Sequence, residues 1–145
     1  NERNQVMIDG HAEAVRIWRL NFLLSTATLS AAGGDLKTLG LVGKEFFVLD
    51  GIEDHPSPAG LAESLSMSKP NLTMHLKALQ ARGLVDRTVD QVDLRRHRLV
   101  LSDSGRELRD KARGIVTARY EDRLQKLSAP ERENFMRLLE KLVLD

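Results

Sequence analysis

The spacing of the apolar residues changes several times along the chain, and each spacing predicts a different element. Over residues 7–29 the apolar positions recur at near-helical intervals, which predicts a long helix that Gly33 and Gly34 end. A second helix is predicted over residues 44–52. Two prolines and a serine in residues 54–58 then break the helical pattern. The apolar residues of the first predicted helix are Ile8, Ala12, Val15, Trp18, Phe22 and Leu29.

Two shorter helices, joined by the tight connection SMS, are predicted next. Ser57 is a suitable N-cap for the first of them, with Pro58 at its first helical position. The second occupies the stretch KPNLTMHLKALQARG, and we expect it to begin at Pro70 because proline disfavours helical geometry at Lys69. Gly83 ends this helix. Its apolar face consists of Leu72, Leu76 and Leu79.

Beyond this glycine the apolar spacing becomes alternating, which is typical of strands. Residues 84–89 and 98–102 predict a β-hairpin with a polar, Asp-rich connection. A long helix then runs to about Leu127, and Ser128 and Glu131 have the spacing of a capping box before a last helix. The apolar stripes of these two helices contain Leu108, Ala112, Ile115, Tyr120, Leu124 and Leu127 in the first and Phe135, Leu138, Leu139, Leu142 and Val143 in the second.

The order of helix, helix, short helix, turn, helix and β-hairpin predicts a winged helix-turn-helix, a mostly α fold with a small β-hairpin wing. A chain of 145 residues fits a single domain, residues 1–145, in which residues 36–103 form the winged helix-turn-helix. The long apolar stripes of residues 1–32 and 104–145 exceed what one subunit can cover, so we expect these helices to join two copies in a homodimer. The alternative is a monomer that folds its termini onto its own core.

Positive charge is concentrated in the middle of the chain. Three arginines and one histidine occupy residues 95–98. Residues 68–100 carry seven Lys or Arg against three Asp, a net charge of +4 in a chain whose total is +1. This asymmetry favours a polyanionic partner such as DNA. The alternative is an ordinary solvated surface whose ion pairs contribute little to stability.

The outward face of the helix that follows the SMS connection suits the major groove of DNA. At about 100° per residue its small and polar side chains lie opposite its leucines, and the groove is wide enough for one helix. Lys69 is placed to meet phosphate, whereas Asn71 and Thr73 lie nearer base edges. The hairpin tip can reach the adjacent minor groove, where Asp93 would hold the Arg95 guanidinium through a bidentate pair. The predicted DNA-binding residues are Ser68, Lys69, Pro70, Asn71, Thr73, Met74, Lys77, Asp93, Arg95 and Arg96.

The stretches LAESLSMSKPNLTMHLKALQARGLVDR and DLRRHRLVLSDSG resemble the MarR family of transcriptional regulators. In that family the wing carries Asp-x-Arg, followed by Leu-Thr and a glycine at the start of the next helix. Asp93, Arg95, Leu101, Ser102 and Gly105 occupy these places, with serine for threonine. The resemblance covers nearly the whole chain. It implies a homodimeric repressor, joined through its terminal helices, that presents two recognition helices and two wings to a near-palindromic operator in double-stranded DNA.

The resemblance also implies a ligand, and the sequence departs from the family at two places. Relatives often bind small aromatic or phenolic anions between the dimerisation helices and the winged helix-turn-helix. Binding then changes the spacing between the two winged helix-turn-helix parts of the dimer. Met74 stands where the family often has arginine or another polar residue, and Lys77 stands where an acidic residue is common. The alternative for the candidate ligand residues is a place in the apolar core or on a solvated face. These candidates are His11, Arg16, Trp18 and Phe22 on the first helix and Phe46 and Phe47 on the second.

Several other classes of function find no support in the sequence. The chain has no cysteine, which argues against thiol-based redox sensing, and its four histidines lack the paired spacing of a helical zinc site. No metalloprotease, phosphate-loop or nucleophile-elbow motif is present, so we expect neither an enzyme nor a cofactor. No stretch has the length of a membrane span and no secretory signal is visible, so we expect a cytoplasmic location. The remaining alternative is a winged helix that binds another protein and senses no ligand.

Overall fold

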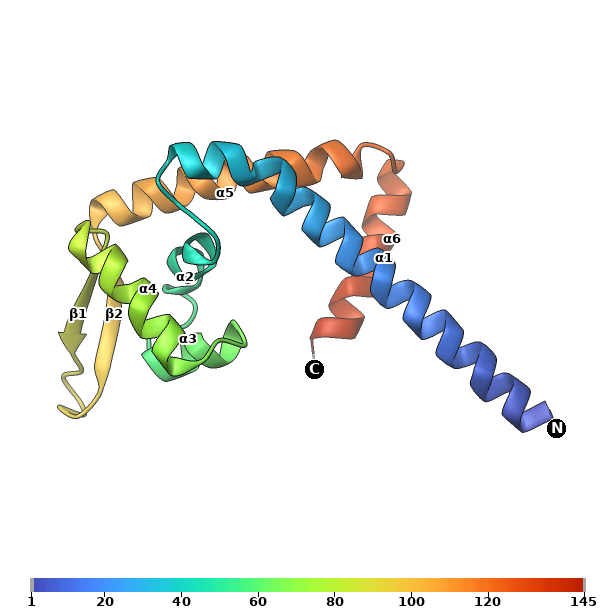
Figure 1. Cartoon of the computed structure of the whole chain (residues 1–145), viewed down its shortest axis with the longest axis horizontal. Helices are drawn as coiled ribbons and strands as arrows, with labels where there is room; N and C mark the ends of the chain where they lie inside the picture. The colour runs from blue at the N-terminus through green and yellow to red at the C-terminus, as the bar shows by residue number, and fades with distance from the viewer. Residues whose placement is uncertain (1, 145) are drawn as a thin grey trace. The chain divides into compact units, whose positions relative to one another are not determined.

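Six helices and one two-stranded antiparallel sheet are present in residues 2–144, the part of the chain that this computed structural model describes (Figure 1). The side chains of residues 3–8, and with them the predicted role of Ile8, lie outside that description. The predicted fold class, mostly α with a β-hairpin wing, is confirmed. No described helix combines the length with the hydropathy that a membrane-spanning segment needs. The elements are α1 (Glu2–Thr38), α2 (Glu45–Gly51), α3 (Pro58–Ser64), α4 (Lys69–Ala81), β1 (Val85–Val89), β2 (His97–Leu101), α5 (Asp103–Leu124) and α6 (Ala129–Val143).

The described residues divide into two compact units. The terminal unit contains residues 2–32 and 116–144, and the central unit contains residues 33–115. The central unit includes the whole predicted winged helix-turn-helix together with the first half of α5. The assignment of the terminal helices to dimerisation stays a prediction.

Short helices build the core of the central unit, and their first turns follow from the local sequence. α3 begins after Ser57, whose hydroxyl accepts a hydrogen bond of 3.0 Å from the backbone N–H of Gly60, as predicted. α4 begins at Lys69 and not at Pro70. The Ser68 hydroxyl accepts a hydrogen bond of 3.4 Å from the Asn71 N–H, and this cap stabilises helical geometry at Lys69 against the preference imposed by the proline. The buried core of these helices contains Val48, Leu49, Leu61, Leu72, Leu76 and Leu79.

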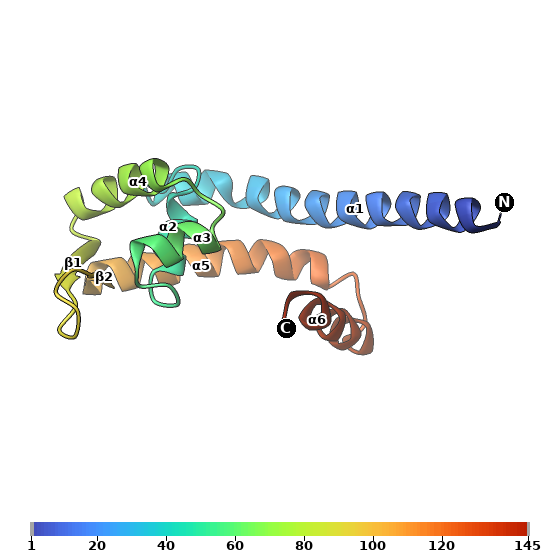
Figure 2. The ribbon, with the colours of Figure 1, turned by 90° about the horizontal axis from the view of Figure 1, so that it is seen from below.

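The wing is the hairpin of β1 and β2, paired with Val85 opposite Leu101. Both of these residues and Leu99 are buried, because this face of the hairpin packs against α3 and α4. The Leu99 N–H donates a hydrogen bond of 2.7 Å to the carbonyl of Pro56, which ties β2 to the segment before α3. Figures 1 and 2 show the tip of the hairpin standing clear of α2, α3 and α4. The tip is therefore free to meet a partner.

α1 is longer than predicted, because Gly33 and Gly34 lie inside the helix and do not end it. Glycine keeps its backbone N–H and carbonyl, so within a helix it costs only about 1 kcal/mol relative to alanine. Ala32 and Leu36 lie four residues apart and are both buried, so the apolar face continues past the glycines. The helix ends before Gly40, whose φ of +75° is the left-handed geometry that glycine adopts without strain.

The helices of the terminal unit leave many apolar side chains exposed within one chain. Trp18 and Phe22 on α1 are 64% and 55% exposed. α6 begins with the predicted capping box, in which Ser128 and Glu131 exchange hydrogen bonds, and none of its described residues is buried. α5 ends at Leu124, and the predicted last turn up to residue 127 is an irregular turn. Further exposed apolar residues of this unit are Ile17, Leu20, Leu23, Met136, Leu138, Leu142 and Val143.

Candidate nucleic-acid interface

The outward face of α4 is exposed, as predicted, and we call it the reading face. Leu72, Leu76 and Leu79 are buried on the opposite side of the helix, so packing fixes which side chains point to solvent. The Thr73 hydroxyl donates a hydrogen bond of 2.9 Å to the Lys69 carbonyl, which uses its only proton. The reading face consists of Ser68, Lys69, Pro70, Asn71, Thr73, Met74 and Lys77, all of which are exposed.

The turn of the wing differs from its predicted geometry at Asp93. One oxygen of this carboxylate accepts a hydrogen bond of 3.0 Å from the backbone N–H of Arg95, and the other lies 3.5 Å from Nε of Arg96. The predicted bidentate pair between Asp93 and the Arg95 guanidinium is therefore wrong. A short polar side chain in a turn bonds the backbone two residues on, and the turn then brings Arg96 beside it.

The same turn leaves the Arg95 side chain directed at solvent. Asp90 holds the preceding segment by accepting a hydrogen bond of 2.8 Å from the Val92 N–H. In the part of the chain that the structure describes, no ion pair involves the Arg95 guanidinium, and the residue is exposed. A cation without a partner at a projecting hairpin tip is well placed to contact a polyanion.

Ser102 and Gly105 join the wing to α5. The Ser102 hydroxyl donates a hydrogen bond of 2.6 Å to the Gly83 carbonyl and accepts one of 3.0 Å from the Gly105 N–H. The Ser102 N–H donates a third, of 3.1 Å, to the Leu84 carbonyl. α5 approaches this segment so closely that a Cβ on Gly105 would overlap the Leu84 carbonyl oxygen. These contacts fix the wing relative to α5 and explain why a hydroxyl residue and a glycine occupy the two positions.

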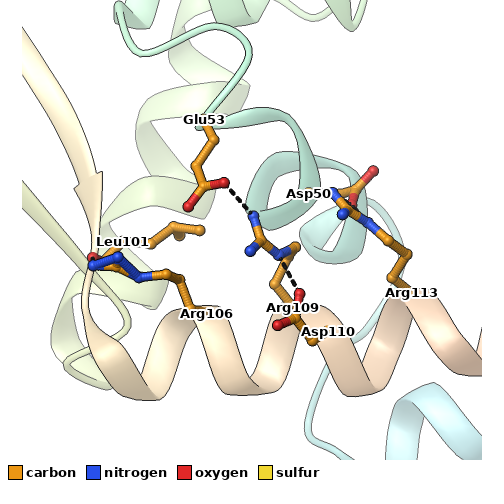
Figure 3. A network of polar contacts seen from close by, with 7 residues as sticks. All are labelled: Asp50, Glu53, Leu101, Arg106, Arg109, Asp110 and Arg113. Atoms are coloured by element: carbon orange, nitrogen blue, oxygen red, sulfur yellow. Dashed lines mark hydrogen bonds and ion pairs between the residues drawn. The ribbon is translucent and has the colours of Figure 1, made fainter.

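The Arg109 guanidinium is buried in the central unit between α5 and the end of α2 (Figure 3). Its Nη1 lies 2.8 Å from a carboxylate oxygen of Glu53, and its Nε lies 2.8 Å from one of Asp110. The hydrogen bond to Glu53 raises the pKa of Arg109 above its ordinary value, and burial opposes that change. Sequence analysis missed this ion pair. The available signal is that Gly105, Arg109 and Ala112 share one face of α5, where a charged group requires a partner.

Two further arginines of α5 make polar contacts, one with α2 and the other with the end of β2. Arg113 donates to Asp50 in α2, with both Nε and Nη2 at 2.8 Å from one carboxylate oxygen. Arg106 donates a hydrogen bond of 3.4 Å to the Leu101 carbonyl at the end of β2 (Figure 3). α5 therefore contacts both α2 and the wing, so the wing and the reading face belong to one packed unit.

The candidate ligand residues fall in both units. On α1, in the terminal unit, the rings of Trp18 and Phe22 are stacked with their centroids 5.8 Å apart, and both are exposed. Arg16 lines a shallow, mostly apolar hollow of the same helix. On α2, in the central unit, Phe46 is buried and contacts Phe47 at a centroid distance of 5.3 Å. Within one chain Phe46 therefore belongs to the apolar core, whereas Trp18 and Phe22 do not. The exposed polar candidates are His11 and Arg16.

The reading face and the wing carry exposed groups that suit contacts with a polyanion. The cations among them are Lys69, Lys77, Arg95 and Arg96, and they can contact phosphates and base edges. Beside them Asn71 can both donate and accept hydrogen bonds. Within the described residues, no group of three or more His, Asp or Glu side chains is arranged to hold a metal ion.

Similar sequences point to one family. Residues 39–96 match the MarR family. The HTH-type transcriptional repressor Rv2887 of Mycobacterium tuberculosis is 33% identical to this chain over 109 residues, which cover 74% of this chain and 78% of that protein.

Solved structures of similar proteins share the fold. The crystal structure of Rv2887 in complex with DNA has a TM-score of 0.71 at 28% identity, over 86% of this chain and 95% of that one. Its complex with salicylic acid has a TM-score of 0.69 at 30% identity, over 85% of this chain and 93% of that one. The apo form of MarR from Escherichia coli, at 23% identity and a TM-score of 0.72 over 86% and 95% of the two chains, has the same fold.

Proposed function

The chain belongs to the MarR family, and we propose that it is a homodimeric transcriptional repressor that binds a near-palindromic operator and leaves it when a small aromatic anion binds. The observation that carries the proposal is one packed unit that presents both the reading face of α4 and the exposed Arg95 of the wing. The complexes of the related repressor Rv2887 with DNA and with salicylic acid support the choice of the two partners.

In the proposed complex the reading face lies in the major groove. Lys69 meets a phosphate near the start of α4, whereas Asn71 and Thr73 face base edges. The Thr73 hydroxyl already donates its proton to the Lys69 carbonyl, so toward DNA it can only accept. The hydrogen-bond partner that suits the Thr73 hydroxyl oxygen is then an amino group on a base edge, such as N6 of adenine or N4 of cytosine.

The wing occupies the adjacent minor groove in the same complex. Arg95 projects from the hairpin tip, and a guanidinium is favoured where the groove is narrow and its negative potential is concentrated. Arg96 is already beside Asp93, so it is the poorer candidate for insertion and the better one for a phosphate contact. This division of roles makes Arg95 the main minor-groove contact of each subunit.

Two copies are required because one chain exposes much apolar surface in its terminal unit. Trp18 and Phe22 on α1 and Leu142 on α6 are each more than half exposed. A symmetric partner would cover such surface and bring two reading faces to successive major grooves, about 34 Å apart. A two-fold protein then selects a near-palindromic site.

Selection from a pool of random duplexes should enrich such a site, and two substitutions should separate positioning from reading. Lys69→Ala should weaken binding to all sequences alike and reduce the slope of log affinity against log salt by about one for each subunit. Asn71→Ala should instead change which base is preferred at one position of each half-site. Fluorescence anisotropy of the selected duplex and its single-base variants, at several salt concentrations, measures both effects.

Lys111→Ala is the matched control, because it removes one exposed positive charge from α5, outside the reading face. It should leave base preference unchanged. If Lys69→Ala and Asn71→Ala alter base preference equally, the roles assigned within the reading face are wrong. A selection that enriches no duplex contradicts sequence-specific DNA binding and favours a winged helix that binds a protein.

Release by a ligand requires that the ligand prefer one of two dimer geometries, which differ in the distance between the two reading faces. An anion that binds both geometries with equal affinity does not shift the equilibrium between them, however tightly it binds. The proposed anion therefore prefers a dimer whose heads do not match successive major grooves. Arg16, on the same helix as Trp18, supplies the charge for a carboxylate.

Salicylate should quench the fluorescence of Trp18, the only tryptophan, and lower the affinity for the selected duplex. The duplex should lower the affinity for salicylate by the same factor. Arg16→Ala should weaken salicylate on the order of tenfold, as expected for a lost charge-assisted hydrogen bond, and leave DNA binding of the free protein nearly unchanged. Salicylamide, which lacks the carboxylate, is the matched control and should bind weakly to both proteins. Absence of quenching, or quenching without coupling to DNA, contradicts this ligand site.

A further inference from the structure

Met74 is the one large apolar side chain of the reading face. It is 58% exposed, although the other exposed residues around it are polar or small. At about 100° per residue it lies roughly opposite the centre of the three buried leucines of α4. Met74 is not among the buried core residues, so its thioether is available to a partner.

The surroundings of Met74 form a shallow hollow on the surface of α4. The hollow is lined by Lys69, Pro70, Thr73, Met74 and Lys77, and most of its lining is apolar. The Thr73 hydroxyl donates a hydrogen bond of 2.9 Å to the Lys69 carbonyl. The methyl group is then the part of the Thr73 side chain that is left for other contacts. The floor of the hollow can therefore receive a small apolar group between two lysines.

We propose that Met74 recognises the C5-methyl group of a thymine in the major groove. The inference rests on the proposed function, because it assumes that α4 enters that groove. The edges of the base pairs offer donors, acceptors and a single kind of apolar group, which is the thymine methyl. Methionine is flexible, donates no hydrogen bond and accepts only weakly, so it complements the methyl and leaves a polar base edge unsatisfied.

The test removes only the methyl group from the DNA. Each thymine of the duplex selected by the whole protein is replaced, one at a time, with uracil, which keeps every hydrogen-bonding group. At one thymine of each half-site the replacement should lower the affinity of the unmodified protein about fourfold, which corresponds to about 0.8 kcal/mol, the transfer free energy of one buried methylene-sized group. Met74→Ala removes this contact from both subunits, so it should bind the thymine duplex about 16-fold more weakly, and it should not distinguish uracil from thymine at that position.

Two control variants separate this contact from its neighbours and from changes in folding. Thr73→Ser removes the other methyl of the hollow and keeps the hydroxyl, so it should still distinguish thymine from uracil. Val42→Ala truncates an apolar side chain of the central unit that is similarly exposed, at 60%, and lies outside the reading face, so it should leave the fourfold preference intact. The midpoint of urea unfolding should be the same for Met74→Ala and the unmodified protein, since the side chain is not part of the core.

The outcomes are distinguishable from failure of the proposed function. If selection enriches no duplex, the proposed function fails and the inference fails with it. If a site is enriched but no uracil replacement affects binding, or if Met74→Ala retains the preference for thymine, sequence-specific DNA binding stands and the role of Met74 is overturned. If Thr73→Ser instead loses the preference, the methyl is recognised by threonine and the inference is overturned as well.

Discussion

Replacing Gly105 with alanine should lower the free energy of unfolding by about 3 kcal/mol, the upper part of the usual range for an overpacked interior site. The added Cβ would overlap the Leu84 carbonyl oxygen and lie 3.0 Å from its carbonyl carbon. Both atoms belong to the backbone, which cannot rotate away as a flexible side chain can. The same oxygen accepts the Ser102 N–H, so moving it also weakens the junction of wing and helix. Urea unfolding followed by circular dichroism measures the loss.

Gly114→Ala is the matched control on the same helix. Apart from its chain neighbours and the backbone of its own helix, a Cβ at Gly114 would meet no atom within 4 Å, and the residue is exposed. Alanine there should raise the free energy of unfolding by about 0.5–1 kcal/mol, because it restricts the unfolded chain and favours the helix. Opposite signs for one substitution at two positions of α5 would locate the effect in the close approach to Leu84. A stable Gly105→Ala protein would mean that this close approach is not required.

Arg95→Ala should weaken binding to the selected duplex by at least about 30-fold without changing the unfolding midpoint. Loss of one base- or groove-contacting arginine costs about 1–3 kcal/mol for each head, and the proposed dimer carries two heads. Arg95 forms no ion pair in the part of the chain that the structure describes, and it is exposed, so its removal leaves no buried charge behind. The variant should also lose its preference for A·T-rich sequence under the wing, because a narrow minor groove no longer meets a guanidinium.

The comparison with Arg95→Lys separates charge from shape. Lysine keeps the positive charge but is more strongly hydrated and lacks the planar guanidinium, so it should restore part of the affinity and little of the A·T preference. Arg96→Ala should have the smaller effect of the two arginine truncations, because Arg96 is already beside Asp93 at 3.5 Å. Unchanged affinity in a folded Arg95→Ala protein would remove the wing from the DNA interface. An equal loss for Arg95→Ala and Arg96→Ala would contradict the division of roles at the tip.

The elements that sequence reasoning predicted correctly depend on contacts between near neighbours in the chain. The spacing of Leu72, Leu76 and Leu79 is a helical period, and it defines the reading face without knowledge of what covers the leucines. The caps at Ser57 and Ser128 bond N–H groups three residues on, so their geometry is complete within one turn.

The errors arose where residue type was used in place of geometry. Gly33 and Gly34 disfavour a helix only weakly. Burial of Ala32 and Leu36 on the same helix stabilises it by more than the two glycines destabilise it. Opposite charges predicted a pair between Asp93 and the Arg95 guanidinium, yet the turn satisfies Asp93 with a backbone N–H and Arg96. On an exposed turn the backbone donor is held in place, whereas an arginine side chain must lose conformational freedom to compete.

By itself the sequence determined the winged fold, the face of α4 that meets solvent and the concentration of cations at the hairpin, because helical and strand periods and charge order are local properties. Only the tertiary structure decided why Gly105 must be glycine and how Arg109 can be buried. Gly105 meets the Leu84 carbonyl, and Arg109 meets Glu53, across segments that are distant along the chain. Such contacts depend on where packing of the whole central unit brings two backbones together, and no period or residue preference encodes that distance.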